Sequence, residues 1–210
     1  PTVPPPSSQG SPTAVNLIPL TDLGTGTYQG YEGGLYPNGQ NTPPADYLSY
    51  GLEKAGEIQP LDSEGTPDDN GKIGLISIGM SNTNRESEQF LETYQDDSSL
   101  NNNLVLVNGA RGWMAAEIMS GKETLPDDSD AFDYYWNEHI PSRLEEVGVT
   151  AEQVQIVWMK QALLHPGLTE AKDFPDDALK LRENEKIIID LLKEEFPNLK
   201  LVYISSRTYG

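Results

Sequence analysis

The stretch that most constrains the fold is residues 72–84, KIGLISIGMSNTN. A turn-forming DDNG cluster precedes its apolar run IGLISIG, and the following NRESEQFL has helical spacing. Strand, tight turn and helix is how a parallel α/β sheet presents a reactive group at the carboxyl end of a strand. Gly79 relaxes the steric limits just before Ser81 in this turn. Asn82 and Thr83 are candidate N-cap residues of the helix.

Ser81 is the candidate reactive group of this turn. Its hydroxyl would lie near the positive N-terminus of the following helix, where a developing oxyanion could be stabilised. The alternative is an ordinary serine, because strand-to-helix turns favour this residue. This stretch alone leaves both interpretations open.

Strand-like and helix-like segments alternate in residues 61–210. Four short apolar runs predict strands, at residues 73–78, 104–107, 154–160 and 199–205. Helical spacing predicts helices at residues 85–94, 113–119, 132–147 and 177–196, the third kinked or divided at Pro141. The alternation predicts a three-layer α/β/α domain with a parallel, flavodoxin-like sheet. Because such sheets usually carry five strands, we expect this domain to be truncated at the C-terminus.

The first 60 residues have a different composition. Residues 1–14 are Pro/Ser-rich, which predicts an extended tether, with a frayed terminus as the alternative. Residues 15–60 are rich in Gly, Pro, Asn and Tyr, apart from a helical pattern at residues 45–58. We expect this segment to wrap over the domain and to bind, since long ordered loops often carry function.

Composition excludes several classes of function. The 210 residues carry a net charge of −19 and no Lys/Arg cluster, which argues against a nucleic-acid binder. The absence of cysteine excludes disulfides, thiol nucleophiles and Cys-based metal sites. No apolar run is long enough to predict a membrane span. Because the chain opens in a linker-like segment, we expect an extracellular or periplasmic protein whose signal segment has been removed.

Three predicted strand ends carry residues that suit acyl transfer. In a parallel sheet these ends share one edge, where ligands bind. Acyl transfer needs a nucleophile and donors aimed at an oxyanion. Ser81 could supply a hydroxyl and its own N–H, Gly109 an unobstructed N–H, and Gln161 a side-chain N–H. The alternatives are a tight turn for Gly109 and a strand-end cap for Gln161.

Over residues 72–210 this pattern resembles the SGNH (GDSL-type) hydrolase superfamily of α/β/α esterases and lipases, which includes carbohydrate deacetylases. The segments GKIGLISIGMSNT, VQIVWMKQA and LKLVYISSRTYG, with the loop GGLYPNGQN, are similar to a bacterial exported group within it. The resemblance implies that Ser81 is the nucleophile. It also implies that Gly109 is an oxyanion donor and that Gln161 stands where the family has Asn.

The sequence departs from the family pattern in three places. This chain has GMS where the family has Gly-Asp-Ser, and MKQA where the family has Gly-x-Asn-Asp. The family's Asp-x-x-His block is missing from it. His165 could reach the predicted edge, although a capping or surface role is the alternative, and His139 is expected on a helix surface. Because serine without a base is a weak nucleophile, we expect a truncated chain, a second fragment that completes the fold, or a non-catalytic relative.

Two functions are therefore predicted. The first is a serine esterase acting on ester groups, such as O-acetyl groups, of an extracellular small molecule or polysaccharide, with no cofactor and no metal. Its candidate substrate-binding residues are Tyr36, Asn41, Asn82 and Arg111. The alternative is a non-catalytic extracellular binding or structural module on the same fold, which binds through the tyrosine-rich loop without turnover.

Acidic and aromatic clusters offer further candidates. Residues 127–133 and 68–70 hold oxygen ligands that suit Ca²⁺, but neither has the spacing of a helix–loop–helix calcium site, so solvated charge is expected. Five aromatic residues could stack on sugar rings, although core positions are expected for them: Trp113, Tyr134, Tyr135, Trp136 and Trp158. Loop tyrosines 28, 31 and 36 are better placed for that role.

Overall fold

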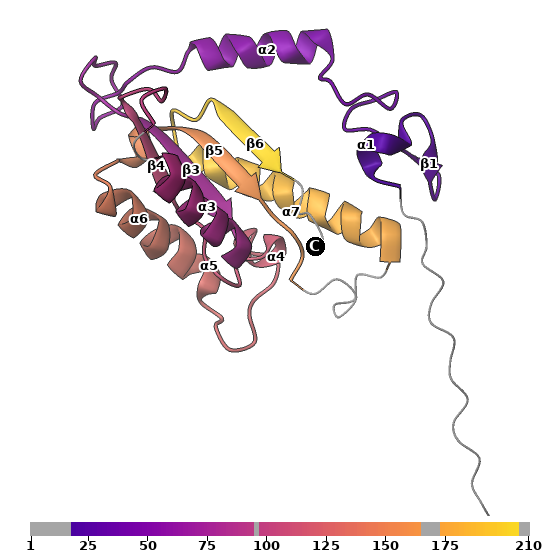
Figure 1. Ribbon diagram of the computed structural model, residues 1–210. Coiled ribbons are helices and arrows are strands. Elements are labelled where there is room, and N and C mark those ends of the chain that lie inside the picture. The colour runs from indigo at the N-terminus through magenta and orange to yellow at the C-terminus, as the bar shows by residue number, and fades with distance from the viewer. Residues whose placement is uncertain (1–17, 95–96, 165–172, 206–210) are drawn as a thin grey trace, which may run out of the picture. The chain divides into compact units, whose positions relative to one another are not determined.

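The computed structural model describes residues 18–94, 97–164 and 173–205. The chain divides into two compact units, Pro1–Gly51 and Leu52–Gly210, and each is described here by itself. Figure 1 shows their elements. No helix among the described residues is long and apolar enough to cross a membrane.

The first unit is rich in loops. It contains α1 (Leu20–Leu23) and an antiparallel pair of two-residue strands, β1 (Thr27–Tyr28) and β2 (Tyr31–Glu32). Several of its glycines are packed so closely that a side chain would meet neighbouring backbone, which explains why this segment contains so much glycine. Helix α2 (Ala45–Gly56) spans the division between the units and confirms the helical pattern predicted there.

The second unit is built on a parallel sheet, as predicted. Its strands are β3 (Ile73–Gly79), β4 (Leu104–Asn108), β5 (Val154–Lys160) and β6 (Leu201–Ser205), in the order β4-β3-β5-β6. All three neighbouring pairs are parallel, so the carboxyl ends of the four strands lie at one edge. At that edge Ser77 pairs with Asn108 and Gly79 pairs with Lys160.

Helices cover both faces of this sheet and give the three-layer α/β fold (Figure 1). Helix α3 (Ser81–Tyr94) follows β3, and α4 (Ala116–Met119) follows β4. Between β4 and β5 the chain also forms α5 (Ala131–Tyr134), the π-helix η1 (Tyr135–His139), α6 (Ile140–Glu146) and the short 3-10 helix η2 (Ala151–Gln153). Helix α7 (Asp173–Glu195) precedes β6.

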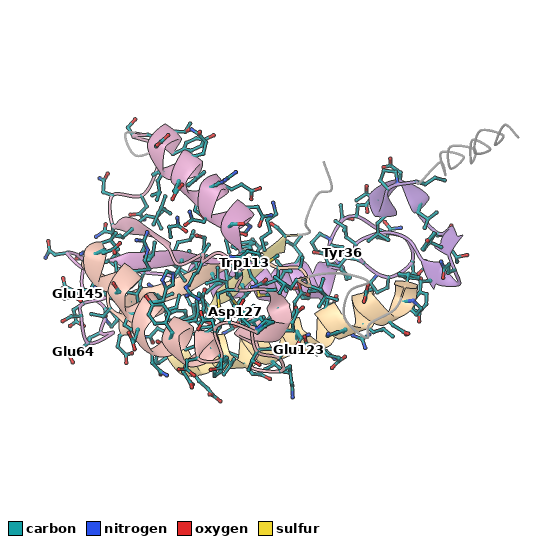
Figure 2. All side chains as sticks on the ribbon, turned by 90° about the horizontal axis from the view of Figure 1, so that it is seen from below. Tyr36, Glu64, Trp113, Glu123, Asp127 and Glu145 are labelled. Atoms are coloured by element: carbon teal, nitrogen blue, oxygen red, sulfur yellow. The ribbon has the colours of Figure 1, made fainter. Side chains whose placement is uncertain are left out.

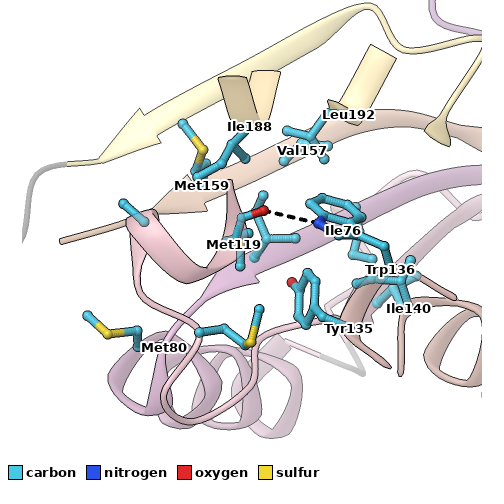
Figure 3. Close-up of a cluster of buried hydrophobic side chains, with 14 of the residues drawn as sticks. Ile76, Met80, Met119, Tyr135, Trp136, Ile140, Val157, Met159, Ile188 and Leu192 are labelled. Carbon is cyan, nitrogen blue, oxygen red and sulfur yellow. Dashed lines mark hydrogen bonds between the residues drawn. The ribbon is translucent and has the colours of Figure 1, made fainter. Parts of the chain in front are cut away.

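The core lies between one face of the sheet and the helices from α4 to α7. Ile76 of β3 and Val157 of β5 are fully buried there, with Ile140 and Leu192 from the helices (Figure 3). The indole N–H of Trp136 donates to the carbonyl of Met119 at 3.1 Å, so this buried polar atom is satisfied. This packing holds α4 against the sheet. It thereby positions the loop between β4 and α4.

The predicted helix at residues 132–147 is divided, but not at Pro141. The interruption is the π-helix Tyr135–His139, and Pro141 lies in the first turn of α6. A missing backbone N–H costs little in the first turn of a helix, which explains why proline is accepted there. Single-turn π-helices are frequent at functional sites, and this one carries side chains that contact the β4 end.

Candidate functional site

The turn between β3 and α3 presents Ser81 at the carboxyl edge of the sheet. Helix α3 begins at Ser81 because the N–H of Asn84 already donates to the Met80 carbonyl, at 3.0 Å. Ser81 is exposed, and its hydroxyl makes no hydrogen bond with any residue that the structure describes. The predicted succession of strand, tight turn and helix is confirmed, and the role of Ser81 stays a prediction.

Gly79 makes this turn possible. A Cβ at Gly79 would press against the Lys160 carbonyl oxygen and the Thr83 hydroxyl, and would lie 2.9 Å from Thr83 Cβ. The backbone there has φ of 153°, a conformation that favours glycine. Because glycine has no side chain, the end of β3 can lie this close to the end of β5 and to the first turn of α3.

The predicted N-caps Asn82 and Thr83 are wrong, because α3 begins before them. Thr83 is buried and donates its hydroxyl to the Lys160 carbonyl at 3.2 Å, which ties the first turn of α3 to the end of β5. Asn82 is half-buried one residue after Ser81, and its part in substrate binding stays a prediction.

Gly109 does not offer a free N–H, which corrects its predicted role as an oxyanion donor. Its N–H donates to the Ser77 carbonyl at 3.0 Å and so extends the β3–β4 ladder by one bond. A Cβ at Gly109 would lie 2.8 Å from Ile76 Cδ1 and 3.0 Å from Ile140 Cδ1. Gly109 is thus a packing position at the end of β4.

Gly112 is the glycine that lies beside Ser81, and the sequence prediction missed it. A Cβ at Gly112 would have Ser81 Cβ as its nearest neighbour, at 4.0 Å. The loop is tied to the end of β3 because the Arg111 N–H donates to the Gly79 carbonyl at 3.0 Å. The N–H of Gly112 donates to no described residue. The available signal was the second glycine of NGARGW, three residues after Gly109.

Gln161 is turned into the protein and is not aimed at Ser81, which corrects its predicted role as a donor. It is only 3% exposed. Its side-chain N–H group donates to the Met114 carbonyl at 3.2 Å and contacts Met119 Sδ at 3.0 Å, while its Oε1 has no described partner. Gln161 therefore holds the loop that carries Gly112, as a positioning residue.

Arg111 faces an acidic pocket next to this loop. Its guanidinium lies 4.8 Å from the centre of the Tyr134 ring and 3.5 Å from an Asp128 carboxylate oxygen. The pocket is lined by Arg111, Asp128, Asp130, Asp133, Tyr134, Asn137 and Glu138. The role of Arg111 in substrate binding stays a prediction, but the pocket provides both charged and aromatic contacts for a ligand.

Two aromatic residues near this pocket are exposed, against the expectation of core positions. Trp113 is 64% exposed and Tyr134 is 41% exposed. Tyr135 and Trp136 are buried as expected, and Trp158 is half-buried. The helical spacing that predicted a core role for Trp113 does not apply, because α4 begins only at Ala116.

Tyr36 and Asn41 lie in the first unit. The Tyr36 N–H donates to the Gln40 carbonyl at 2.9 Å, and its ring lies 6.0 Å from that of Tyr47. The Asn41 amide donates to the Thr21 carbonyl at 2.8 Å. These contacts are internal to that unit, so the part of both residues in binding stays a prediction.

His139 is a half-buried anchor of the β4 end, and the predicted surface position is wrong. Its Nε2 lies 3.2 Å from the Gly109 carbonyl oxygen, which also accepts the Tyr135 hydroxyl at 3.0 Å. Burial lowers the pKa of His139 below its ordinary value of 6.5, against the opposing effect of the Gly109 hydrogen bond. The nearby guanidinium groups of Arg111 and Arg143 lower the pKa further.

This lowered pKa predicts a pH-dependent stability. A histidine that stays neutral in the fold while the unfolded chain takes up a proton contributes stability that is fully present above pH 6.5 and is lost as the pH falls from there through the lowered pKa of the folded state. The unfolding free energy of the wild type should drop between about pH 7.5 and about pH 5.5. In His139→Gln, whose amide can still donate to Gly109, urea unfolding should show a smaller drop. Parallel pH profiles for the two proteins would contradict the assignment.

Among the described residues, none is hydrogen-bonded to the Ser81 hydroxyl as a base would be, and none belongs to a group that could hold a metal ion. No histidine or carboxylate in residues 18–94, 97–164 and 173–205 contacts the Ser81 hydroxyl, and His165 lies outside these ranges. No group of three or more His, Asp or Glu within them could hold a metal ion, and this includes both acidic loops. What remains at the edge is an exposed hydroxyl beside a helix N-terminus and a free loop amide.

Comparison with known proteins gives no identity. No protein-family model, no curated protein and no solved structure matches the chain. What the carboxyl edge can do therefore follows from its geometry.

Proposed function

We propose that the carboxyl edge of the sheet is a serine-esterase site in which Ser81 is the nucleophile. The observation that supports this best is the exposed Ser81 hydroxyl, which has no described partner and lies beside Gly112. Ser81 opens a helix of 14 residues, whose dipole favours negative charge at this end. An ester carbonyl bound here would meet a nucleophile and a positive potential together.

Two backbone amides are candidates for the oxyanion site. The N–H groups in the first turn of a helix have no intrahelical acceptor, and the Ser81 N–H belongs to this turn. The Gly112 N–H likewise donates to no described residue. In the proposed reaction the Ser81 oxygen attacks the ester carbonyl carbon, the alcohol leaves with a proton, and water then hydrolyses the acyl-serine.

The reaction also needs a base to take the Ser81 proton. No described histidine or carboxylate hydrogen-bonds to the Ser81 hydroxyl, so the proposal assigns no residue as the base. We further propose an ester with a small acyl group, such as an O-acetyl group on an extracellular glycan, as the substrate. The acidic surface suits such an exterior location, and the reaction itself needs no cofactor.

Substitution of Gly112 by alanine tests the site without disturbing the fold. The added methyl group would lie 4.0 Å from Ser81 Cβ, where the substrate carbonyl must enter, and the φ of Gly112 requires no glycine. We expect kcat/KM for 4-nitrophenyl acetate to fall roughly 10-fold or more in the protein as its source makes it. The melting temperature should stay that of the wild type.

Gly109→Ala is the matched control for this prediction. Its methyl group would press on Ile76 and Ile140, so the variant should lose about 1–3 kcal/mol of stability. The folded fraction should keep the wild-type kcat/KM, since the Gly109 N–H is already bound to Ser77. Unchanged activity in Gly112→Ala would remove this residue from the site.

The second candidate function is a non-catalytic binding module on the same edge. It is favoured by the exposed Trp113 and by the absence of a base from the contacts of Ser81 among the described residues. A module of this kind binds its ligand without turnover and is indifferent to Ser81→Ala. Hydrolysis assays on that variant separate the two functions.

A further inference from the structure

Trp113 has the largest exposed fraction of the large apolar residues reported as exposed in the described ranges (labelled in Figure 2). It is 64% exposed, whereas Trp136 is 7% exposed and Trp158 is half-buried. Leaving an indole in water forgoes the stabilisation that burial of its large apolar surface would bring. Single exposed apolar residues are common on protein surfaces, so the exposure of Trp113 gains weight only together with its backbone conformation and its position.

The backbone at Trp113 is also unusual. Its φ of 69° lies in the left-handed region, where a bulky residue is a genuine outlier. Two other described non-glycine residues have positive φ, Gln29 and Asn38, and asparagine is a type that tolerates this region. Strained backbone of this kind persists only when its surroundings hold it, and it clusters at ligand-binding sites.

Several contacts hold the strained loop in place. The Ala115 N–H donates to the Trp113 carbonyl at 2.8 Å, and the Met114 N–H donates to the Arg111 carbonyl at 3.3 Å. The buried Gln161 amide donates to the Met114 carbonyl from β5's end, at 3.2 Å. The loop thus fixes an exposed indole in a conformation that the chain would not otherwise adopt.

The position of Trp113 relates it to the candidate site. It directly follows Gly112, which lies beside Ser81, and it comes two residues after Arg111, which borders the acidic pocket. The loop therefore carries the indole one residue away from the glycine that borders Ser81. Arg111 connects this loop to the carboxylates and the amide of the pocket, because its guanidinium lies over the Tyr134 ring and beside Asp128.

The chemical groups of Trp113 and of the acidic pocket indicate which class of ligand they can bind. The flat apolar face of an indole packs on the C–H face of a pyranose ring, while carboxylate and amide groups such as Asp128 and Asn137 accept or donate to sugar hydroxyls. A net charge of −19 and an acidic pocket disfavour an anionic glycan. A neutral sugar ring offers an apolar face to the indole and hydroxyl groups to the pocket, and it carries no negative charge that the acidic surface would repel.

We propose that Trp113 stacks on a neutral pyranose ring of the ligand and thereby presents an ester on that ring to Ser81. The ester half of this inference rests on the proposed function. The stacking half does not, because a ring can bind to Trp113 whether or not Ser81 reacts. The two halves can therefore be tested separately.

The test is titration of partially O-acetylated xylo-oligosaccharides into the protein as its source makes it, in a Ser81→Ala background that prevents turnover. Isothermal titration should show binding to Ser81→Ala, and a second substitution, Trp113→Ala, should weaken it roughly 3- to 10-fold. Trp113→Phe should retain most of the affinity. Tyr94→Ala is the matched control, since Tyr94 is 40% exposed at the far end of α3, about 20 Å from Ser81.

Each outcome decides between the halves. Equal affinity with and without Trp113, or no binding of the oligosaccharide at all, overturns the stacking role. Trp113-dependent binding without any hydrolysis by the wild type keeps the stacking role and overturns the esterase. If the wild type hydrolyses 4-nitrophenyl acetate through Ser81 but binds the glycan equally well without Trp113, the esterase is kept and the stacking role is overturned. The melting temperatures of the Trp113 variants should match that of Ser81→Ala, because Trp113 is exposed, whereas Tyr94→Ala should lose only its ring contact with Phe90.

Discussion

We expect Ser81→Ala to abolish the proposed hydrolysis of small acetyl esters, with a loss in kcat/KM on the order of 10³-fold or more. The reason is that the proposed acyl-enzyme forms through the Ser81 oxygen, and no neighbouring hydroxyl can replace it in the same turn. The stability should change by less than about 0.5 kcal/mol, because Ser81 is exposed and its hydroxyl has no described partner. Assays with 4-nitrophenyl acetate and thermal unfolding measure the two quantities on one preparation.

Ser63→Ala is the matched control for this result. Ser63 is also exposed, and it lies in the segment before β3, away from the carboxyl edge. Its loss should leave both activity and stability as in the wild type. If Ser81→Ala retained the wild-type rate, the site would not be a serine esterase, and the binding module would be the remaining function.

We expect Gly79→Ala to lower the unfolding free energy by roughly 2–4 kcal/mol. The new Cβ would meet the Lys160 carbonyl and the Thr83 side chain, and neither can move away. The Lys160 carbonyl belongs to a sheet strand, and Thr83 is buried with its hydroxyl bound to that carbonyl. Urea unfolding followed by circular dichroism measures the loss.

The same methyl group placed at Gly112 gives the control for this prediction. A Cβ at Gly112 has no neighbour closer than Ser81 Cβ at 4.0 Å, so this variant should unfold at the urea concentration of the wild type. Gly79→Ala and Gly112→Ala thus separate a structural glycine from a site glycine, although the two loops are joined by the hydrogen bond from the Arg111 N–H to the Gly79 carbonyl. Equal midpoints for the two variants would contradict the packing of this turn.

The parallel sheet could be predicted from the sequence because its strands are short apolar runs between turns. Residues 154–160 form β5 as predicted, and β3 and β4 each extend one residue beyond their predicted ends. The π-helix at Tyr135–His139 could not be predicted in the same way. It brings the Tyr135 hydroxyl and the His139 ring to the Gly109 carbonyl, and helical spacing contains no information on such contacts between distant segments.

The candidate site was only partly predictable for a related reason. Ser81 follows from a local pattern of strand, turn and helix. The choice between Gly109 and Gly112 depends on the register of β4 against β3, because that register gives the Gly109 N–H an acceptor in Ser77. The direction of Gln161 depends on the packing of α4, whose neighbouring carbonyl at Met114 accepts its amide.

The most direct test of the esterase site is labelling of the protein, as its source makes it, with a fluorophosphonate probe, followed by intact mass and peptide mapping. The probe forms a covalent bond only with a serine whose hydroxyl is activated as a nucleophile. The proposed site predicts one adduct, located on Ser81 and absent from Ser81→Ala. No adduct, or an adduct on a different serine, would contradict the assignment of Ser81 as the nucleophile.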